Sequence, residues 1–368
     1  MVRALTRETD KETGTMAFDA VRGVQAGREF YVTMVSFKTI AEHFKFDDPS
    51  IAADQRAQRK IRESRIPQIV NYIIQNPDSY IFSSITVSVG GRMVFQPSPG
   101  LGELGKTGTL TIFMDSPLLI NDGQHRCAAI KEAYYKYKEF QNEKISVVFF
   151  SDKGLERSQQ MFADLNKHAV KPTKSLGLLY DHRDTFARFI VNLVDDIDVF
   201  HGRTETERAS IAPRSKNFFT LNGIADATRY LLKLNTKSIP AEKQKLAKEF
   251  WETIAKNMPD WQLLLDKNNK VSPTDLRERY VHAYTNILNA IGLAGHVLVT
   301  QHTDWKNMLK NLKQIPWERD DPIWEGKIMI DGKMIKNKVG IKKAVDVILH
   351  KCGSHTTLDE FEKQLVKA

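Results

Sequence analysis

Cysteine is scarce in this chain, which has only two in 368 residues, Cys127 and Cys352. Two cysteines so far apart in sequence give neither a disulfide framework nor the ligand spacing of a zinc site. No apolar run approaches the ~18 residues that span a membrane, and polar residues follow the first few positions where a signal peptide would have its apolar core. We therefore expect a cytoplasmic protein that does not associate with a membrane.

Three other sequence patterns are missing, and one kind of charge is in excess. The Gly-x4-Gly-Lys-Ser/Thr pattern of a P-loop does not occur, so the sequence does not indicate an ordinary ATPase. No internal repeat and no clean helix-turn-helix pattern occur either. Lys and Arg, in contrast, number 54 against 45 Asp and Glu, which gives a formal net charge of +9. This excess suits a partner that carries phosphates, although many basic proteins bind none.

The hydrophobic periodicity predicts an α+β protein with a mixed first half and a mainly helical second half. In the first half we expect strands at 21–24, 30–36, 80–89, 92–95, 110–113 and 145–150, and helices at 37–44, 66–75 and 155–167. In the second half we expect helices at 175–194, 218–234, 241–256 and 273–299, a hairpin at 327–335 and a last helix at 341–350. The expected organisation is a disordered tail (1–17), an α+β domain (18–170) and a mostly helical domain (171–368).

One stretch, Asp122-Gly123-Gln124-His125-Arg126, interrupts an apolar run that resumes at Cys127 with good helix formers. The pattern predicts a strand, a tight turn and a helix that runs to about Phe140. Gly123 gives the turn its backbone freedom, and Asp122 is a natural cap for the helix start. His125 and Arg126 then fall in the first helical turn, where cations are unfavourable unless an anion is held there. The alternative is a capped helix start with two solvated polar residues.

The side chains of this turn suit phosphate chemistry. Arg126 can hold a phosphate bidentately, and His125 can donate to it and titrates near neutral pH. Asp122 would repel a phosphate, so it fits better as the cap or as a ligand for Mg²⁺ that travels with ATP. If the site is catalytic, Asp122 and His125 are the candidates for the base. Cys127, one residue further on, is expected to be a small core residue.

These residues also carry a family resemblance. The five-residue turn is the signature of the DGQHR-domain proteins, and the flanks match too, with Gln55–Pro67 and Tyr72–Asn76 upstream and Met161–Lys167 and Lys171-Pro172 downstream. Within that group the chain resembles the DndB family, the regulatory members of the DNA phosphorothioation (sulfur modification) system. The resemblance runs from about residue 20 to the end of the chain.

The domain also resembles, more distantly, the ParB and sulfiredoxin fold, in which a strand–turn–helix unit holds nucleotide phosphates. That resemblance implies a mixed sheet with helices and a pocket for ATP or another nucleotide with Mg²⁺. Gln124 stands where sulfiredoxin has its cysteine, so reduction of sulfinic acids is not expected. For Asn166, the alternative is that it only ends the helix, because asparagine is a usual helix terminator. Arg59 and Arg65 belong to a basic stretch for which a solvated helix face is the alternative, and the family match favours these two arginines. The implied nucleotide- or phosphate-binding residues are Gly123, Gln124, His125, Arg126, Arg59, Arg65, Asn166 and Lys167.

Two basic segments are candidates for contact with the DNA backbone. The first lies beside Phe218 and Phe219, and the second is close to the C-terminus. The alternative for each is a basic surface that binds no nucleic acid, and we expect Trp317 and Trp324 to be packing residues rather than base stackers. The candidate DNA-binding residues are Arg203, Arg208, Arg214 and Lys216 in the first segment and Lys336, Lys338, Lys342 and Lys343 in the second.

The resemblance implies a DNA-binding transcriptional regulator of a DNA phosphorothioation (dnd) gene cluster, with the promoter of that cluster as its DNA partner. An enzyme that hydrolyses ATP on or with DNA in the sulfur-modification system is the alternative. A third hypothesis is an assembly partner of the sulfur-modification enzymes, for which the basic surface would be incidental. Self-association and contact with other sulfur-modification proteins stay open.

Overall fold

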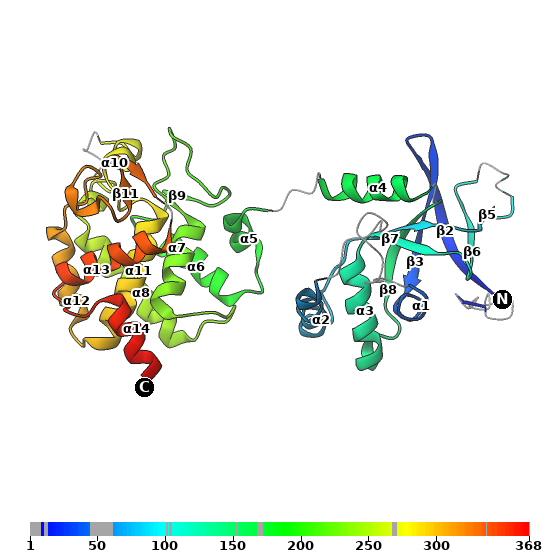
Figure 1. The fold of residues 1–368 in the computed structure, drawn as a ribbon, viewed down its shortest axis with the longest axis horizontal. Helices are drawn as coiled ribbons and strands as arrows, with labels where there is room; N and C mark the ends of the chain where they lie inside the picture. The colour runs from blue at the N-terminus through cyan, green and yellow to red at the C-terminus, as the bar shows by residue number, and fades with distance from the viewer. Residues whose placement is uncertain are drawn as a thin grey trace. The chain divides into compact units, whose positions relative to one another are not determined.

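The computed structural model describes residues 9–10, 14–44, 62–100, 102, 105–151, 154–167, 172–266, 271–335 and 337–367. The chain divides into two compact units, residues 1–170 and 171–368, called here the N-terminal and C-terminal units (Figure 1). The predicted α+β class is confirmed, because the first unit is built on a mixed sheet and the second is mainly helical. Within the described residues, no helix is both long and apolar enough to cross a bilayer.

An eight-stranded sheet organises the N-terminal unit, in the order β5-β6-β2-β3-β8-β4-β7 with β1 beside β2. The pairings are antiparallel except for β4 with β8, which is parallel and makes the sheet mixed. Strands β2 and β3 form a hairpin, and its two turn residues, Ala26 and Gly27, both have the positive φ that a tight two-residue hairpin turn requires. The strands are β1 (Thr9–Asp10), β2 (Thr15–Gln25), β3 (Arg28–Ser36), β4 (Ile85–Val89), β5 (Met93–Pro97), β6 (Thr107–Phe113), β7 (Leu118–Asp122) and β8 (Lys144–Ser151).

The two faces of this sheet differ. Side chains alternate along a strand, and one set, including Val87, Ile120 and Phe149, is fully buried in the core of the unit. Helices α1 (Phe37–His43), α2 (Ile66–Gln75) and α3 (Gln124–Lys136) cover that face, and α4 (Leu155–Lys167) lies on the other side of the sheet (Figure 1). The second face is therefore only partly covered, which leaves Met34 about half exposed there.

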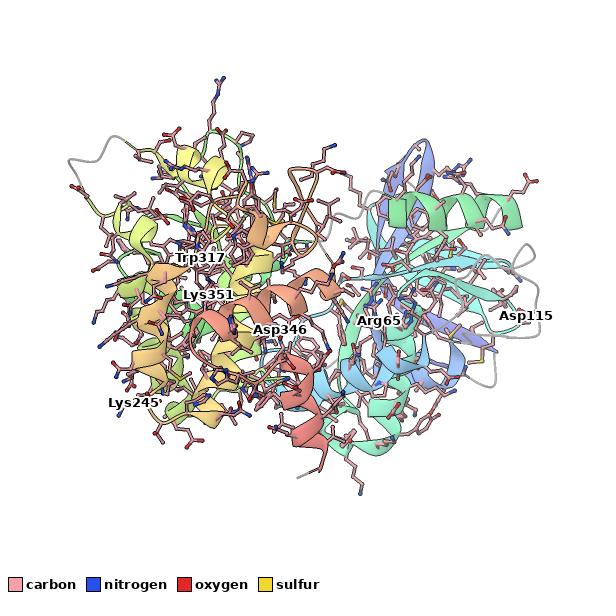
Figure 2. The ribbon with its side chains drawn as sticks, turned by 60° about the vertical axis from the view of Figure 1, so that its left-hand side comes forward. Arg65, Asp115, Lys245, Trp317, Asp346 and Lys351 are labelled. Atoms are coloured by element: carbon pink, nitrogen blue, oxygen red, sulfur yellow. The ribbon has the colours of Figure 1, made fainter. Side chains whose placement is uncertain are left out.

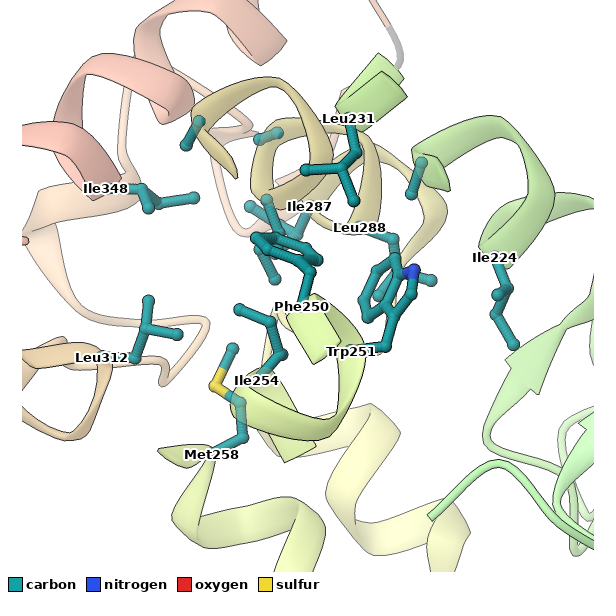
Figure 3. Packing of buried hydrophobic residues seen from close by; sticks show 14 of the residues in the cluster. Ile224, Leu231, Phe250, Trp251, Ile254, Met258, Ile287, Leu288, Leu312 and Ile348 are labelled. Atoms are coloured by element: carbon teal, nitrogen blue, oxygen red, sulfur yellow. The ribbon is translucent and has the colours of Figure 1, made fainter. Parts of the chain in front are cut away.

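The C-terminal unit packs around one large apolar cluster. Helices α7 and α11 lie against each other so closely that a Cβ on Gly292 would meet the carbonyl oxygen of Ala227 at 2.1 Å. Figure 3 shows Leu231 of α7 and Ile287 of α11 around Phe250 of α8. The helices are α5 (Lys174–Tyr180), α6 (Thr185–Asp196), α7 (Leu221–Leu232), α8 (Ala241–Asn257), α9 (Pro259–Gln262), α10 (Pro273–Arg279), α11 (Thr285–Gln301), α12 (Trp305–Met308), α13 (Lys338–Lys351) and α14 (Leu358–Lys367).

Short elements complete the two units. The predicted hairpin near the end of the chain is confirmed as β11 (Met329–Ile330) and β12 (Lys333–Met334), joined through Asp331 and Gly332 with positive φ. Strands β9 (Thr204–Glu205) and β10 (Phe219–Thr220) pair in parallel. The 3-10 turns are η2 (Glu63–Arg65), η3 (Lys138–Phe140), η4 (Leu309–Gln314) and η5 (Pro322–Trp324).

Several predicted boundaries are wrong, each for a local reason. The expected helix 175–194 is two helices, because the Asp184 side chain accepts from the backbone of Ala187 and starts α6. The expected helix 273–299 also breaks, because Tyr280 is extended and pairs with Glu318. The helix predicted to be last is followed by α14, which is only ten residues long and has a short apolar side. Strand β4 begins at Ile85 instead of residue 80, and α3 ends at Lys136 before a 3-10 turn.

The expected packing role of two tryptophans is confirmed. Trp317 and Trp324 are buried, and their rings stack with centroids 5.4 Å apart. Figure 2 places Trp317 inside the C-terminal unit. Beside Trp317 lies His282, which is completely buried: Trp261 Nε1 donates to His282 Nδ1 over 3.0 Å, and His282 Nε2 faces Asp260 Oδ2 at 3.1 Å. Burial lowers the pKa of His282, although Asp260 acts in the opposite direction.

This histidine makes the stability of the C-terminal unit depend on pH. The unfolded chain binds the proton near the ordinary pKa of about 6.5, whereas the folded chain binds it only at lower pH. Stability is therefore unaffected above that value and falls as the pH drops below it. The variant His282→Asn keeps a hydrogen-bond donor and an acceptor but does not titrate. Between pH 7 and pH 5.5 we expect its free energy of unfolding to fall by about 1 kcal/mol less than that of the wild type.

Urea unfolding followed by tryptophan fluorescence measures this directly, because all five tryptophans belong to the C-terminal unit. The pKa of His296 is lowered too, by burial, but this histidine is present in both proteins and its effect cancels in the comparison. Equal losses of unfolding free energy in the two proteins would show that His282 is not the group responsible.

Candidate functional site

The predicted strand–turn–helix unit is present and is tighter than expected. Strand β7 ends at Asp122 and α3 begins at Gln124, so Gly123 alone connects them. Gly123 has φ +107, in the left-handed region that favours glycine, and a Cβ there would lie 3.0 Å from Ile85 Cγ1. No side chain caps the start of α3. The first backbone N–H groups of a helix have no partner within the helix, so this end can bind an anion.

The expected capping role of Asp122 is wrong. Asp122 is the last residue of β7, and because Ile120 points into the core, the alternation of the strand directs the Asp122 side chain toward the same face, which carries α3. There its Oδ2 accepts a hydrogen bond of 2.6 Å from Nη2 of Arg126, four residues further on. The Asp122 side chain stays 45% exposed, whereas that of Arg126 is only 14% exposed.

Arg126 fastens the turn to the segment that leads into β4. Its Nη1 donates to the carbonyl oxygens of Ser83 (2.5 Å) and Ser84 (3.2 Å) and to the hydroxyl of Ser83. With Asp122 on Nη2, both terminal nitrogens of the guanidinium have acceptors within the protein. Nη2 carries two N–H groups, so a phosphate that binds there either shares Nη2 with Asp122 or displaces that half-exposed carboxylate.

His125 joins the turn to the upstream basic segment. The backbone N–H of Arg62 donates to His125 Nε2 over 2.9 Å. A ring nitrogen that accepts a hydrogen bond carries no proton, so protonation of Nε2 would break this contact. Arg65, in η2, follows three residues later with an exposed side chain. Two motifs about 60 positions apart in sequence therefore meet at the start of α3, and Arg59 lies outside the described residues.

Two amide side chains beside the turn are buried. Gln124 is 6% exposed, and its Nε2 donates to the carbonyl oxygen of Ile120 over 2.7 Å, so it ties the helix to the strand. Asn121 is completely buried on the other sheet face, where its Nδ2 donates to Ser88 Oγ (2.6 Å) and approaches Met161 Sδ (3.2 Å). Sequence reasoning missed Asn121, although a lone amide in the apolar run before the turn is a usable signal.

The end of α4 lies apart from the turn. Because α4 packs on the face that carries Asn121, Lys167 belongs to the sheet side opposite α3 (Figure 1). Lys167 is exposed, and among the described residues no hydrogen bond or ion pair connects it to the turn. The side chain of Asn166 lies outside the described part of the chain.

The candidate DNA-binding side chains fall into two groups. Arg208, Arg214, Lys216 and Lys338 are exposed, and Lys336 lies outside the described residues. Three others are held by the protein itself. Arg203 donates to the carbonyl oxygens of Asp198, His201 and Leu264, Lys342 forms ion pairs with Asp359 (2.7 Å) and Glu362 (3.1 Å), and Lys343 donates to the carbonyl oxygen of Gly326.

Neither a metal cluster nor a reactive thiol accompanies the turn. Across the ranges that the structure describes, no three His, Cys, Asp or Glu side chains gather in a way that could hold a metal ion. The predicted core position of Cys127 is confirmed: it is fully buried, and burial raises the pKa of its thiol to about 12.

The geometry of the turn makes Gly123→Ala costly for two separate reasons, backbone strain and the contacts of the new Cβ with Ile85 and Arg126. We expect the substitution to lower the free energy of unfolding by about 1–3 kcal/mol. The matched control is Gly27→Ala in the β2–β3 turn, where φ is +70 and nothing lies within 4 Å of the added Cβ. Calorimetry should show a smaller loss of unfolding free energy for the control than for Gly123→Ala. Equal losses would mean that the close approach of Ile85 and Arg126 to Gly123 has no effect on stability.

The comparisons with known proteins give one family. A family model described as DndB: DNA-sulfur modification-associated matches residues 18–355. No curated protein and no solved structure matches the chain. The matched span begins in β2, includes the Asp122–Arg126 turn and continues through α13. The chain therefore belongs to the DndB family of DNA-sulfur modification-associated proteins.

Proposed function

We propose that this chain is a DNA-binding transcriptional regulator of a DNA phosphorothioation gene cluster, and that a nucleotide with Mg²⁺ binds at the Asp122–Arg126 turn and adjusts its hold on DNA. Membership of the family supports a role in the sulfur-modification system. The observation that carries the nucleotide half is the uncapped start of α3, where His125, Arg126 and the backbone of Arg62 come together.

The phosphates of the nucleotide bind the backbone N–H groups at the start of α3, where the helix dipole favours negative charge. Arg65, exposed and close in sequence to Arg62, adds a cation at the rim. The ligand competes with Asp122 for Arg126, and the displaced carboxylate then contacts the Mg²⁺ that accompanies the phosphates. In the ParB and sulfiredoxin proteins that the turn resembles, the same kind of unit holds nucleotide phosphates.

The DNA half of the proposal rests on charge. The chain carries a net charge of +9, and the segment around Arg208, Arg214 and Lys216 presents exposed cations. Such side chains bind phosphates of the DNA backbone and supply affinity without sequence choice. Lys342 is a weaker candidate, because two carboxylates already neutralise it.

An ATP-hydrolysing enzyme is the less favoured function. Hydrolysis needs a base or a group that positions water, and the candidates at the turn are Asp122 and His125. Asp122 is ion-paired to Arg126, and His125 accepts a hydrogen bond from the backbone of Arg62. Both side chains are thus engaged in holding the turn together, which suits a binding site better than a catalytic one.

The DNA-binding half predicts that removing three exposed cations weakens binding. We expect the triple variant Arg208→Ala, Arg214→Ala, Lys216→Ala to bind the DNA upstream of its gene cluster at least about tenfold more weakly, with a shallower dependence on salt. Fluorescence anisotropy with a labelled duplex, titrated at several salt concentrations, measures both quantities.

A matched triple variant removes the same charge from another part of the unit: Lys245→Ala, Lys256→Ala, Lys313→Ala, all at exposed positions. Figure 2 shows Lys245 projecting from the C-terminal unit. This control should bind the duplex like the wild type. If both triple variants lose affinity equally, or if scrambled DNA binds as well as the upstream DNA, the proposal of specific binding through this segment fails.

The nucleotide half predicts that Arg65→Ala weakens nucleotide binding. Arg65 is exposed and makes no side-chain cap, so the variant should keep its fold while losing at least about fivefold in affinity for Mg·ATP, or for Mg·CTP or Mg·GTP if one of these binds better. Calorimetric titration of the full chain gives the affinity. The control is Arg92→Ala, which removes a side chain stacked over Phe113 and should leave the affinity for the nucleotide unchanged. Undiminished binding in Arg65→Ala would place the nucleotide elsewhere.

A further inference from the structure

A large cavity of the N-terminal unit lies away from the turn. It has a volume of about 820 Å³ and opens on the sheet face that carries α4. Its floor is formed by β3, β4 and β8, and its walls by the tip of the β2–β3 hairpin and by α4. None of the described residues that line it belongs to the Asp122–Arg126 turn. The volume falls in the range of small-molecule sites.

Two arginines of this cavity lack partners. Arg28 comes from the hairpin tip and Arg157 from the first turns of α4. Neither side chain makes a hydrogen bond or an ion pair with any described residue. The Nε atom of Arg157 is buried from solvent without an acceptor. A buried cationic donor with no acceptor is unfavourable, so the arrangement leaves a requirement for an acceptor inside the cavity.

The carboxylates of the cavity do not meet that requirement. Glu29 accepts hydrogen bonds from Arg22 (3.3 Å) and from the hydroxyl of Tyr31 (2.7 Å). Asp164 accepts from the amide of Gln160 over 2.6 Å. Both acids are thus committed to other partners while the two arginines are not. Among the described residues, the carboxylates of the cavity therefore leave both guanidinium groups open to an anion from outside.

The floor between these cations is suited to a flat ring. Phe30 and Phe150 lie side by side on β3 and β8, with ring centroids 5.6 Å apart and planes inclined by 25°, and both remain partly exposed. Hydroxyl groups of Thr86 and Ser88 border this apolar surface. Ser88 is fixed from below by the amide of Asn121, so the polar part of the floor is held in place.

We propose that this cavity binds a phosphorylated small molecule with a planar ring, the chemistry of a nucleoside monophosphate. Its phosphate lies between Arg28 and Arg157, and its ring lies on Phe30 and Phe150. A phosphate monoester carries close to two negative charges at neutral pH and matches two unpaired guanidinium groups, as a single carboxylate does not. This site is separate from the nucleotide site proposed at the turn, and each can exist without the other.

The test is a calorimetric titration of the full chain with adenosine 5′-monophosphate and cytidine 5′-monophosphate. Inorganic phosphate serves as the anion alone, and adenosine as the ring alone. At least one monophosphate should bind at least tenfold more tightly than either fragment. Arg157→Gln, which removes the charge and keeps most of the side chain, should weaken that binding at least tenfold.

Two further variants keep the test decisive. Arg28→Gln alters an exposed hairpin residue and should also weaken binding, so a folding defect in Arg157→Gln cannot hide the answer. Arg65→Gln, at the turn, should leave monophosphate binding unchanged, and a loss there would assign the binding to the turn and overturn the proposal. Absence of monophosphate binding at millimolar concentration, affinity equal to that of inorganic phosphate, or wild-type binding in both Arg157→Gln and Arg28→Gln would also overturn it.

Discussion

The arrangement of the N-terminal unit around its signature depends on one guanidinium group. Arg126, in the first turn of α3, links the end of β7 through Asp122 with the segment before β4 through Ser83 and Ser84, which lie 43 and 42 positions upstream in sequence. Gly123 is the condition for this link, because only a residue without a Cβ fits beside Ile85 at that backbone angle. The same contacts that hold the turn in place occupy the side chain best suited to grip a phosphate.

We propose that this double use of Arg126 gives the turn two states, in which Arg126 has different partners. In the state described here, Asp122 supplies the negative charge that Arg126 requires, and the backbone of Arg62 supplies the hydrogen that His125 Nε2 accepts. A bound phosphate would replace Asp122 and draw in the cations that follow Arg62. A ligand shifts such an equilibrium only by its difference in affinity for the two states, and here the differing contacts can be named. The other sheet face, with its unpaired Arg157, offers a second and independent place for an anion.

Part of the fold and of the candidate site could be predicted from the sequence, because the signals for those parts are local. The interrupted apolar run around Gly123 predicted strand, turn and helix correctly, and Asp331-Gly332 predicted the terminal hairpin. The partner of Asp122 could not be predicted in this way. Capping propensity favoured the helix start, but Asp122 is the last residue of β7, and its side chain lies on the face of Arg126. The break at Tyr280 and the bond from Arg62 to His125 depend on residues far away in sequence, and a local pattern carries no information about them.

Hydrogen exchange at the turn tests the central claim, that the start of α3 is a phosphate site, most directly. The backbone amides of residues 123–127 and 62–66 can be followed by mass spectrometry with and without a saturating nucleotide and Mg²⁺. We expect slower exchange in both segments when the nucleotide is present, since the ligand accepts from N–H groups at the start of α3 and holds residues 62–66 against them. Unchanged exchange at residues 123–127 with a nucleotide demonstrably bound to the chain would contradict it.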